Sequence, residues 1–97
     1  MRVMSVEELF ERIRMLSYRL LNSVHYLSSE SVRAILEEIA NLYEEYISKL
    51  PPEYRDADFT VMTPNGMFRV SRRWIPNILR RASTLTPDIK AILESFL

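Results

Sequence analysis

The feature that most constrains this chain is a pair of long apolar stripes between residues 5 and 50, separated by a short joint. In the first stripe, apolar residues recur at steps of three and four: Val6, Leu9, Ile13, Leu16, Leu20, Val24 and Leu27. The second stripe has similar spacing and comprises Val32, Ile35, Leu36, Ile39, Leu42, Tyr43, Tyr46 and Ile47. Such steps keep residues on one face of an α-helix. Because a joint of two or three residues makes two helices antiparallel neighbours, the sequence predicts a helical hairpin over residues 5–50.

Capping residues set the ends of this hairpin. Ser5, with Glu8 three residues later, forms a capping box in which the two residues satisfy each other's backbone N–H groups. We expect the first helix to run to about Leu27, and either Ser28 or Ser29 to cap the second helix. The second helix is expected to end at residue 50, because the two prolines that follow cannot continue it.

The pattern changes after the second helix. Residues 51–58 contain two prolines and are polar, which predicts a linker. Residues 59–71 are rich in β-branched and aromatic side chains on both sides of Pro64-Asn65-Gly66, where proline presets a turn and glycine supplies a positive φ. This pattern predicts a β-hairpin, and one face must pack on the helices because an isolated hairpin is only marginally stable. The candidate core residues of that face are Phe59, Val61, Phe68 and Val70.

Residues 75–97 predict two short helices. The first begins at Ile75, has a proline in its first turn and ends near Ser83. The second has Thr86 as its N-cap and Pro87 at its first helical position, and runs to residue 97. The predicted fold is therefore mostly α: a small α+β single domain with an antiparallel helical hairpin, a β-hairpin and two short C-terminal helices.

The composition argues against several functional classes. The chain has no cysteine and a single histidine, His25, with no carboxylate cluster around it in the sequence. Asp56 and Asp58 lack a third ligand nearby in sequence, so we expect an exposed acidic turn there, with no metal and no other cofactor. The sequence has no glycine-rich phosphate loop and no evident acid–base pair, and it predicts no catalytic residue.

No apolar segment reaches membrane-spanning length, and the first residues lack the apolar core of a signal peptide. We therefore expect a cytoplasmic protein with no membrane partner. Arginine supplies 11 of the 13 basic residues and glutamine is absent, a composition compatible with a thermophile.

Charge is unevenly distributed although the net charge is zero. Residues 59–97 carry six basic and two acidic side chains, whereas residues 1–58 carry seven basic and 11 acidic ones. The strongest polar signal is an arginine cluster around Trp74, which comprises Arg69, Arg72, Arg73, Arg80 and Arg81. These residues suit phosphate contacts with Trp74 stacked on a base, or an acidic protein partner. The alternative is that Trp74 fills the core while the arginines pair with acidic residues of the second helix. Those acidic residues are Glu37, Glu38, Glu44 and Glu45.

Residues 90–97 resemble the PCNA-interacting peptide of replication and repair proteins. Leu93 matches the aliphatic residue of that motif, Phe96 matches its first aromatic residue, and the two residues between them match its acidic and polar spacer. Lys90 stands where the motif has glutamine, and Leu97 where it has a second aromatic residue. The resemblance implies docking of these four residues on a sliding clamp, as a helix in an apolar groove. The same spacing also suits a helix packed in the core of its own chain.

Together these features predict a non-catalytic accessory subunit that binds a protein partner in a larger assembly. The clamp-like tail and the arginine cluster place this assembly in DNA replication or repair, such as a DNA polymerase or a sliding clamp. One alternative is direct nucleic-acid binding through the arginine cluster. Another is self-assembly, in which the apolar stripes of residues 5–50 extend across a homodimer interface.

Overall fold

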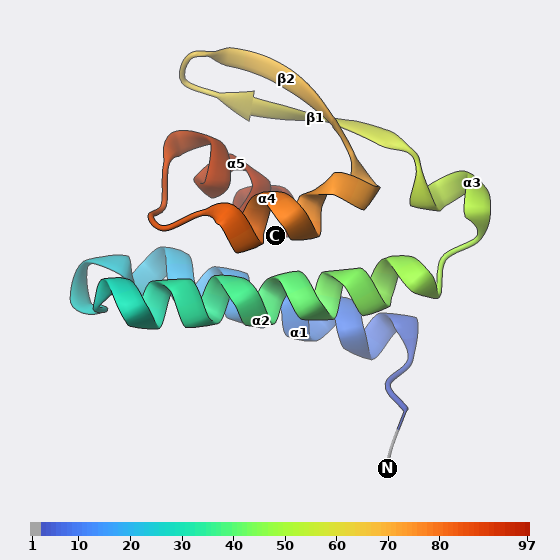
Figure 1. Ribbon diagram of the computed structural model, residues 1–97, viewed down its shortest axis with the longest axis horizontal. Coiled ribbons are helices and arrows are strands. Elements are labelled where there is room, and N and C mark those ends of the chain that lie inside the picture. The colour runs from blue at the N-terminus through green and yellow to red at the C-terminus, as the bar shows by residue number, and fades with distance from the viewer. Residues whose placement is uncertain (1–2) are drawn as a thin grey trace.

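A helical hairpin forms the base of the fold, as the apolar stripes predict (Figure 1). The computed structural model, which describes residues 3–97 apart from the side chain of Phe59, has α1 at Val6–Ser23 and α2 at Ser29–Ser48. A single 3-10 turn, η1 at Val24–Tyr26, leads from α1 into the joint. Every residue of the two stripes is buried or half-buried. The chain therefore covers both stripes with its own residues.

The predicted helix caps are confirmed. The Ser5 hydroxyl accepts a hydrogen bond from the Glu8 N–H at 3.2 Å, and the Ser28 hydroxyl accepts one from the Ser31 N–H at 3.1 Å. Each bond satisfies one of the backbone donors that the first turn of a helix leaves free. Ser28, rather than Ser29, is therefore the N-cap of α2.

The segment predicted as a linker is partly helical, which corrects that interpretation. A short helix, α3, spans Pro52–Arg55, with proline in its first position where a missing N–H is tolerated. The Arg55 guanidinium donates hydrogen bonds to the carbonyl oxygens of Leu50 at 2.8 Å and Ser48 at 3.0 Å. Ser48 is the last residue of α2, two residues before the predicted end, and its carbonyl has no helical partner. Arg55 therefore ties α3 to the end of α2.

The predicted β-hairpin is present, with β1 at Asp58–Thr63 and β2 at Gly66–Ser71. The strands are antiparallel, and Val61 lies opposite Phe68 in the register. Of the four predicted core residues, Val61 and Val70 are buried and Phe68 is half-buried, whereas the side chain of Phe59 lies outside the described residues. One face of the hairpin therefore packs on the helices, as expected.

Two short helices form a middle layer between the helical hairpin and the β-hairpin (Figure 1). A 3-10 turn, η2 at Arg72–Trp74, leads into α4 at Ile75–Arg81, which packs on α2. The last helix, α5 at Pro87–Ser95, contacts both α1 and β1. It begins at the predicted cap, where the Thr86 hydroxyl accepts a hydrogen bond from a backbone N–H. Helix α4 ends two residues before the predicted position, because the chain becomes extended at Ala82.

Candidate functional site

The structure divides the arginine cluster into paired and unpaired residues. Arg80 on α4 forms an ion pair with Glu44 of α2 and donates a hydrogen bond to the Asn41 side-chain oxygen at 2.7 Å. Glu38 of α2 instead pairs with Arg12 of α1, at 3.4 Å. Within the described residues, the predicted pairing of the cluster with α2 is therefore found at Arg80 alone.

The other four arginines have different surroundings. Arg73 lies 3.4 Å from Asp56, and both side chains are exposed to solvent. Such an exposed pair contributes little to stability. Arg69 and Arg81 are exposed and form no ion pair with any other described residue. Arg72 is half-buried and faces a different part of the molecule, described below.

Trp74 is half exposed, with 50% of its surface accessible, so the expectation that it fills the core is wrong. It is the last residue of η2, and Ile75 and Pro76 after it take the buried positions of α4. The Arg73 guanidinium carbon lies 5.0 Å from the centroid of the Trp74 ring. This distance is typical of a cation–π contact.

Trp74 opens onto a shallow hollow of about 280 Å³ that is lined by Asn77, Ile78 and Arg81. These positions follow Trp74 at steps of three, four and seven residues, which places all of them on one helical face. We refer to this site, together with the neighbouring Arg73, as the Trp74 surface. The sequence shows the spacing of these four residues. It does not show whether their common face is exposed or packed in the core.

The two main anchors of the clamp-like tail are part of the core. Leu93 is fully buried and Phe96 is 4% exposed. This burial agrees with the alternative prediction, in which the segment packs in the core of its own chain. Docking through these two side chains would require α5 to leave the molecule. Lys90 and Leu97 are exposed, and Leu97 shares a surface hollow with Met15 and other residues of α1.

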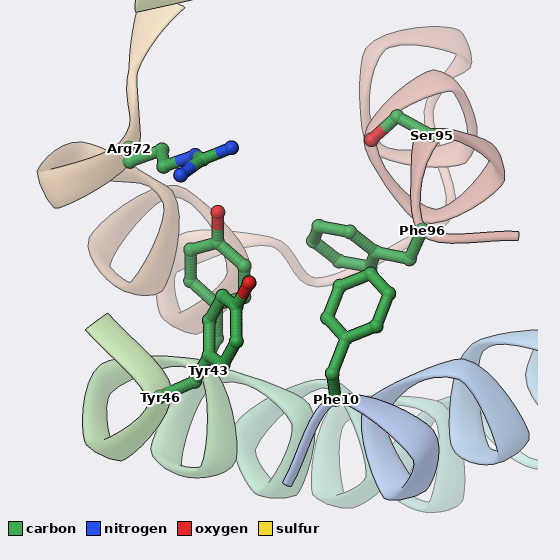
Figure 2. Close-up of a pocket in the computed structure, with 6 residues that line it drawn as sticks. All are labelled: Phe10, Tyr43, Tyr46, Arg72, Ser95 and Phe96. Atoms are coloured by element: carbon green, nitrogen blue, oxygen red, sulfur yellow. The ribbon is translucent and has the colours of Figure 1, made fainter. Parts of the chain in front are cut away.

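A second concave site was not predicted from the sequence. It is a pocket of about 250 Å³ where α1, α2, α5 and η2 meet (Figure 2). We call it the aromatic pocket, and its lining residues are Phe10, Tyr43, Tyr46, Arg72, Ser95 and Phe96. The rings pack on one another: Tyr43 stacks on Phe96 with centroids 5.1 Å apart, and Phe10 lies 5.3 Å from Tyr46. No pattern in the sequence links these residues, because they come from four separate elements.

Polar groups face the aromatic pocket on the side of Arg72. Figure 2 shows the hydroxyl ends of Tyr43 and Tyr46 pointing away from α2, toward the side on which the Arg72 guanidinium lies. Burial raises the pKa of Tyr43 to about 12, and the positive charge of Arg72 opposes part of this shift. The Tyr43 hydroxyl is therefore protonated at neutral pH and can act as a hydrogen-bond donor.

Searches against protein-family models, curated proteins and solved structures found no match to this chain. No group of three or more potential metal-ligating side chains occurs among the residues that the structure describes. In the same part of the chain, no helix is both long and apolar enough to cross a membrane. The two candidate sites are therefore judged on their own chemistry.

Proposed function

We propose that this protein is a non-catalytic interaction subunit that docks on an acidic surface of a protein partner through the Trp74 surface. The observation that carries the proposal is the half-exposed Trp74 ring, which Arg73 contacts and which shares its hollow with Arg81. Tryptophan and arginine are the residue types most enriched among those that dominate binding energy at protein interfaces. A concave site with an aromatic anchor and a basic rim suits an acidic segment that carries an apolar side chain.

A protein partner fits this surface better than nucleic acid does. Only Arg69 and Arg81 of the cluster lack both an ion pair and a side-chain hydrogen bond within the described residues. Two or three phosphate contacts give a salt dependence of only about −2 to −3 in log K against log salt, whereas specific binders often make about 6–10 contacts. Glu44, which is paired with Arg80, lines the hollow next to the Trp74 surface together with Arg73, so the positive charge does not continue along the surface as an extended phosphate backbone requires.

The assembly that contains the partner is a further part of this proposal. The resemblance of residues 90–97 to a clamp-binding peptide favours DNA replication or repair machinery, with Lys90 and Leu97 as the exposed members of that motif. Burial of Leu93 and Phe96 weakens this support, because the two main anchors of the motif are used within the chain. The Trp74 surface does not depend on the motif.

The test is affinity purification of the tagged full chain from cells of its source, with nuclease present, followed by mass spectrometry. We expect a stoichiometric protein partner that is retained by the wild type and lost with Trp74→Ala. Removing a central tryptophan from an interface costs about 2 kcal/mol or more, or roughly 30-fold in affinity. The matched control is Tyr18→Ala, which removes another exposed aromatic side chain, on α1, and should retain the partner.

Trp74 is the single tryptophan of the chain, so its fluorescence reports directly on this surface in vitro. Titration of the purified partner should change the emission, and adding a single-stranded oligonucleotide at low salt should not. If only nucleic acid co-purifies and disappears with nuclease, the direct nucleic-acid-binding alternative replaces the proposal. A partner that survives Trp74→Ala would also contradict it.

A further inference from the structure

The aromatic pocket has donors that the protein itself leaves unused. Tyr43 is only 3% exposed as a residue, but it lines the pocket, and its hydroxyl has no hydrogen-bond partner among the described residues. The hydroxyl is therefore free to bond to a group that enters the pocket. Because the hydroxyl points toward the Arg72 side of the pocket (Figure 2), a ligand there can accept a hydrogen bond from it.

Arg72 supplies a positive charge at the same place. Its Nη1 donates a long hydrogen bond, 3.4 Å, to the carbonyl oxygen of Tyr54. This bond leaves Nε and Nη2, the two donors on one edge of the guanidinium, without a partner among the described residues. Such an edge matches the two oxygens of a carboxylate. No acidic side chain lines the pocket to neutralise Arg72.

Apart from the Tyr46 hydroxyl, the rest of the pocket is apolar or already satisfied. The rings of Phe10 and Phe96 pack beside the tyrosines, and they lie 6.5 Å from each other and nearly perpendicular. Ser95 donates its hydroxyl proton to the carbonyl of Ile92, so it supplies no donor to a ligand. Aromatic walls of this kind favour a flat apolar group, which can pack against their faces and edges.

We infer that the aromatic pocket binds a small aromatic carboxylate, with the carboxylate on Arg72 and Tyr43 and the ring against Phe10 and Phe96. The pocket volume of about 250 Å³ lies just below the range of about 300–1,000 Å³ typical of drug-sized ligands, which favours a ligand of one ring. A phosphate dianion fits less well, because one guanidinium would leave part of its charge uncompensated among aromatic rings. This site goes beyond the proposed docking function and does not depend on it.

The experiment is titration of the full chain with phenylacetate, followed by calorimetry and by NMR signals of the pocket residues. Phenylacetamide, which has the same shape without the charge, is the matched ligand control. We expect saturable binding of phenylacetate and binding of the amide that is weaker by about tenfold or more, as for the loss of a hydrogen bond to a charged group. This comparison uses the wild-type protein and needs no variant to fold.

Three variants locate the site. Arg72→Gln should weaken phenylacetate binding by about tenfold or more, and Tyr43→Phe, which keeps the ring, by about threefold to tenfold. Arg69→Gln removes the same charge from an exposed position on β2 and should change affinity less than about twofold. Trp74→Ala should also leave the binding unchanged, which separates this site from the proposed docking surface.

Several results would overturn the inference. They are the absence of saturable binding at millimolar phenylacetate, equal affinity for phenylacetate and phenylacetamide, and equal losses with Arg72→Gln and Arg69→Gln. Tighter binding of phenyl phosphate than of phenylacetate would also contradict it, because the ligand class would then be wrong.

Discussion

At the scale of single residues, Tyr43 combines an apolar ring that packs in the core with a polar hydroxyl that faces a pocket. Its ring packs between Tyr46 and Phe96, with centroids 5.6 Å and 5.1 Å away, and its hydroxyl reaches the aromatic pocket. Burial disfavours the ionised phenolate and raises the pKa of Tyr43 from 10.0 to about 12. The folded protein therefore keeps this proton to higher pH than the unfolded chain does.

This difference predicts how stability depends on alkaline pH. Below about pH 10 Tyr43 is protonated in both states, and between about pH 10 and 12 the unfolded chain loses the proton first, so stability falls as pH rises. A shift of about two pKa units corresponds to about 2–3 kcal/mol. Urea denaturation across this range should therefore show a steeper loss for the wild type than for Tyr43→Phe. Tyr18→Phe, at an exposed position, should follow the wild type, and identical profiles for all three would contradict the expected shift.

The residue scale is also where the sequence was least informative. Arg72 and Trp74 are two positions apart in one basic segment, and the sequence alone places both in a single cluster. The 3-10 turn η2 directs Arg72 to the aromatic pocket and Trp74 to the surface of α4. The direction of a side chain in such a turn depends on how the flanking elements pack, and no periodicity in the sequence encodes it.

At the scale of elements, the β-hairpin depends on the conformation of one residue. Gly66 has a φ of +126°, and no residue other than glycine has a positive φ among the described residues. The Thr63 hydroxyl braces the same turn, because it donates to the Gly66 carbonyl at 2.7 Å and accepts from the Asn65 N–H at 3.2 Å. The turn is therefore fixed by the backbone conformation of Gly66 and by the hydrogen bonds of Thr63, rather than by packing.

We predict that Gly66→Ala destabilises the protein by about 1–3 kcal/mol, because L-residues rarely adopt this φ. The loss would come from the backbone alone, since a Cβ atom at Gly66 would meet nothing within 4 Å. Thermal unfolding measures it. Asn65→Ala, at the neighbouring exposed position, should change stability by less than about 0.5 kcal/mol. Equal effects of the two substitutions would show that the turn does not hold Gly66 in this conformation.

Elements with a local physical cause were predictable. The stripes, the caps at Ser5 and Ser28, and the Pro64-Asn65-Gly66 turn each follow from residues close in sequence, and the structure has all of them. Helix α3 could not be predicted from the sequence. It is stabilised by hydrogen bonds from Arg55 to the end of α2, and these cannot be recognised before the position of that end is known. The aromatic pocket could not be predicted either, because its residues come together only when α1, α2, α5 and η2 have packed.

At the scale of the whole molecule, α5 closes the core. It contacts α1 on one side and β1 on the other, and its residues Ile89, Ile92 and Leu93 are buried between these elements. The stripes of α1 and α2 are covered within the chain, so self-assembly through them would need the fold to open. The same argument applies to docking through the buried half of the clamp-like motif.

Two leucines of this motif provide a direct test of that argument. Leu93→Ala removes a fully buried side chain and should lower the free energy of unfolding by about 2–5 kcal/mol, measured by urea denaturation. Leu97→Ala makes the same chemical change four residues later, where the side chain is 53% exposed, and should change it by less than about 0.5 kcal/mol. If Leu93→Ala left stability unchanged, α5 would not be part of the core in solution, and its apolar face would be free to dock in the groove of a partner. A large loss for Leu93→Ala alone would instead mean that any contact made by the folded tail involves its exposed residues, Lys90 and Leu97.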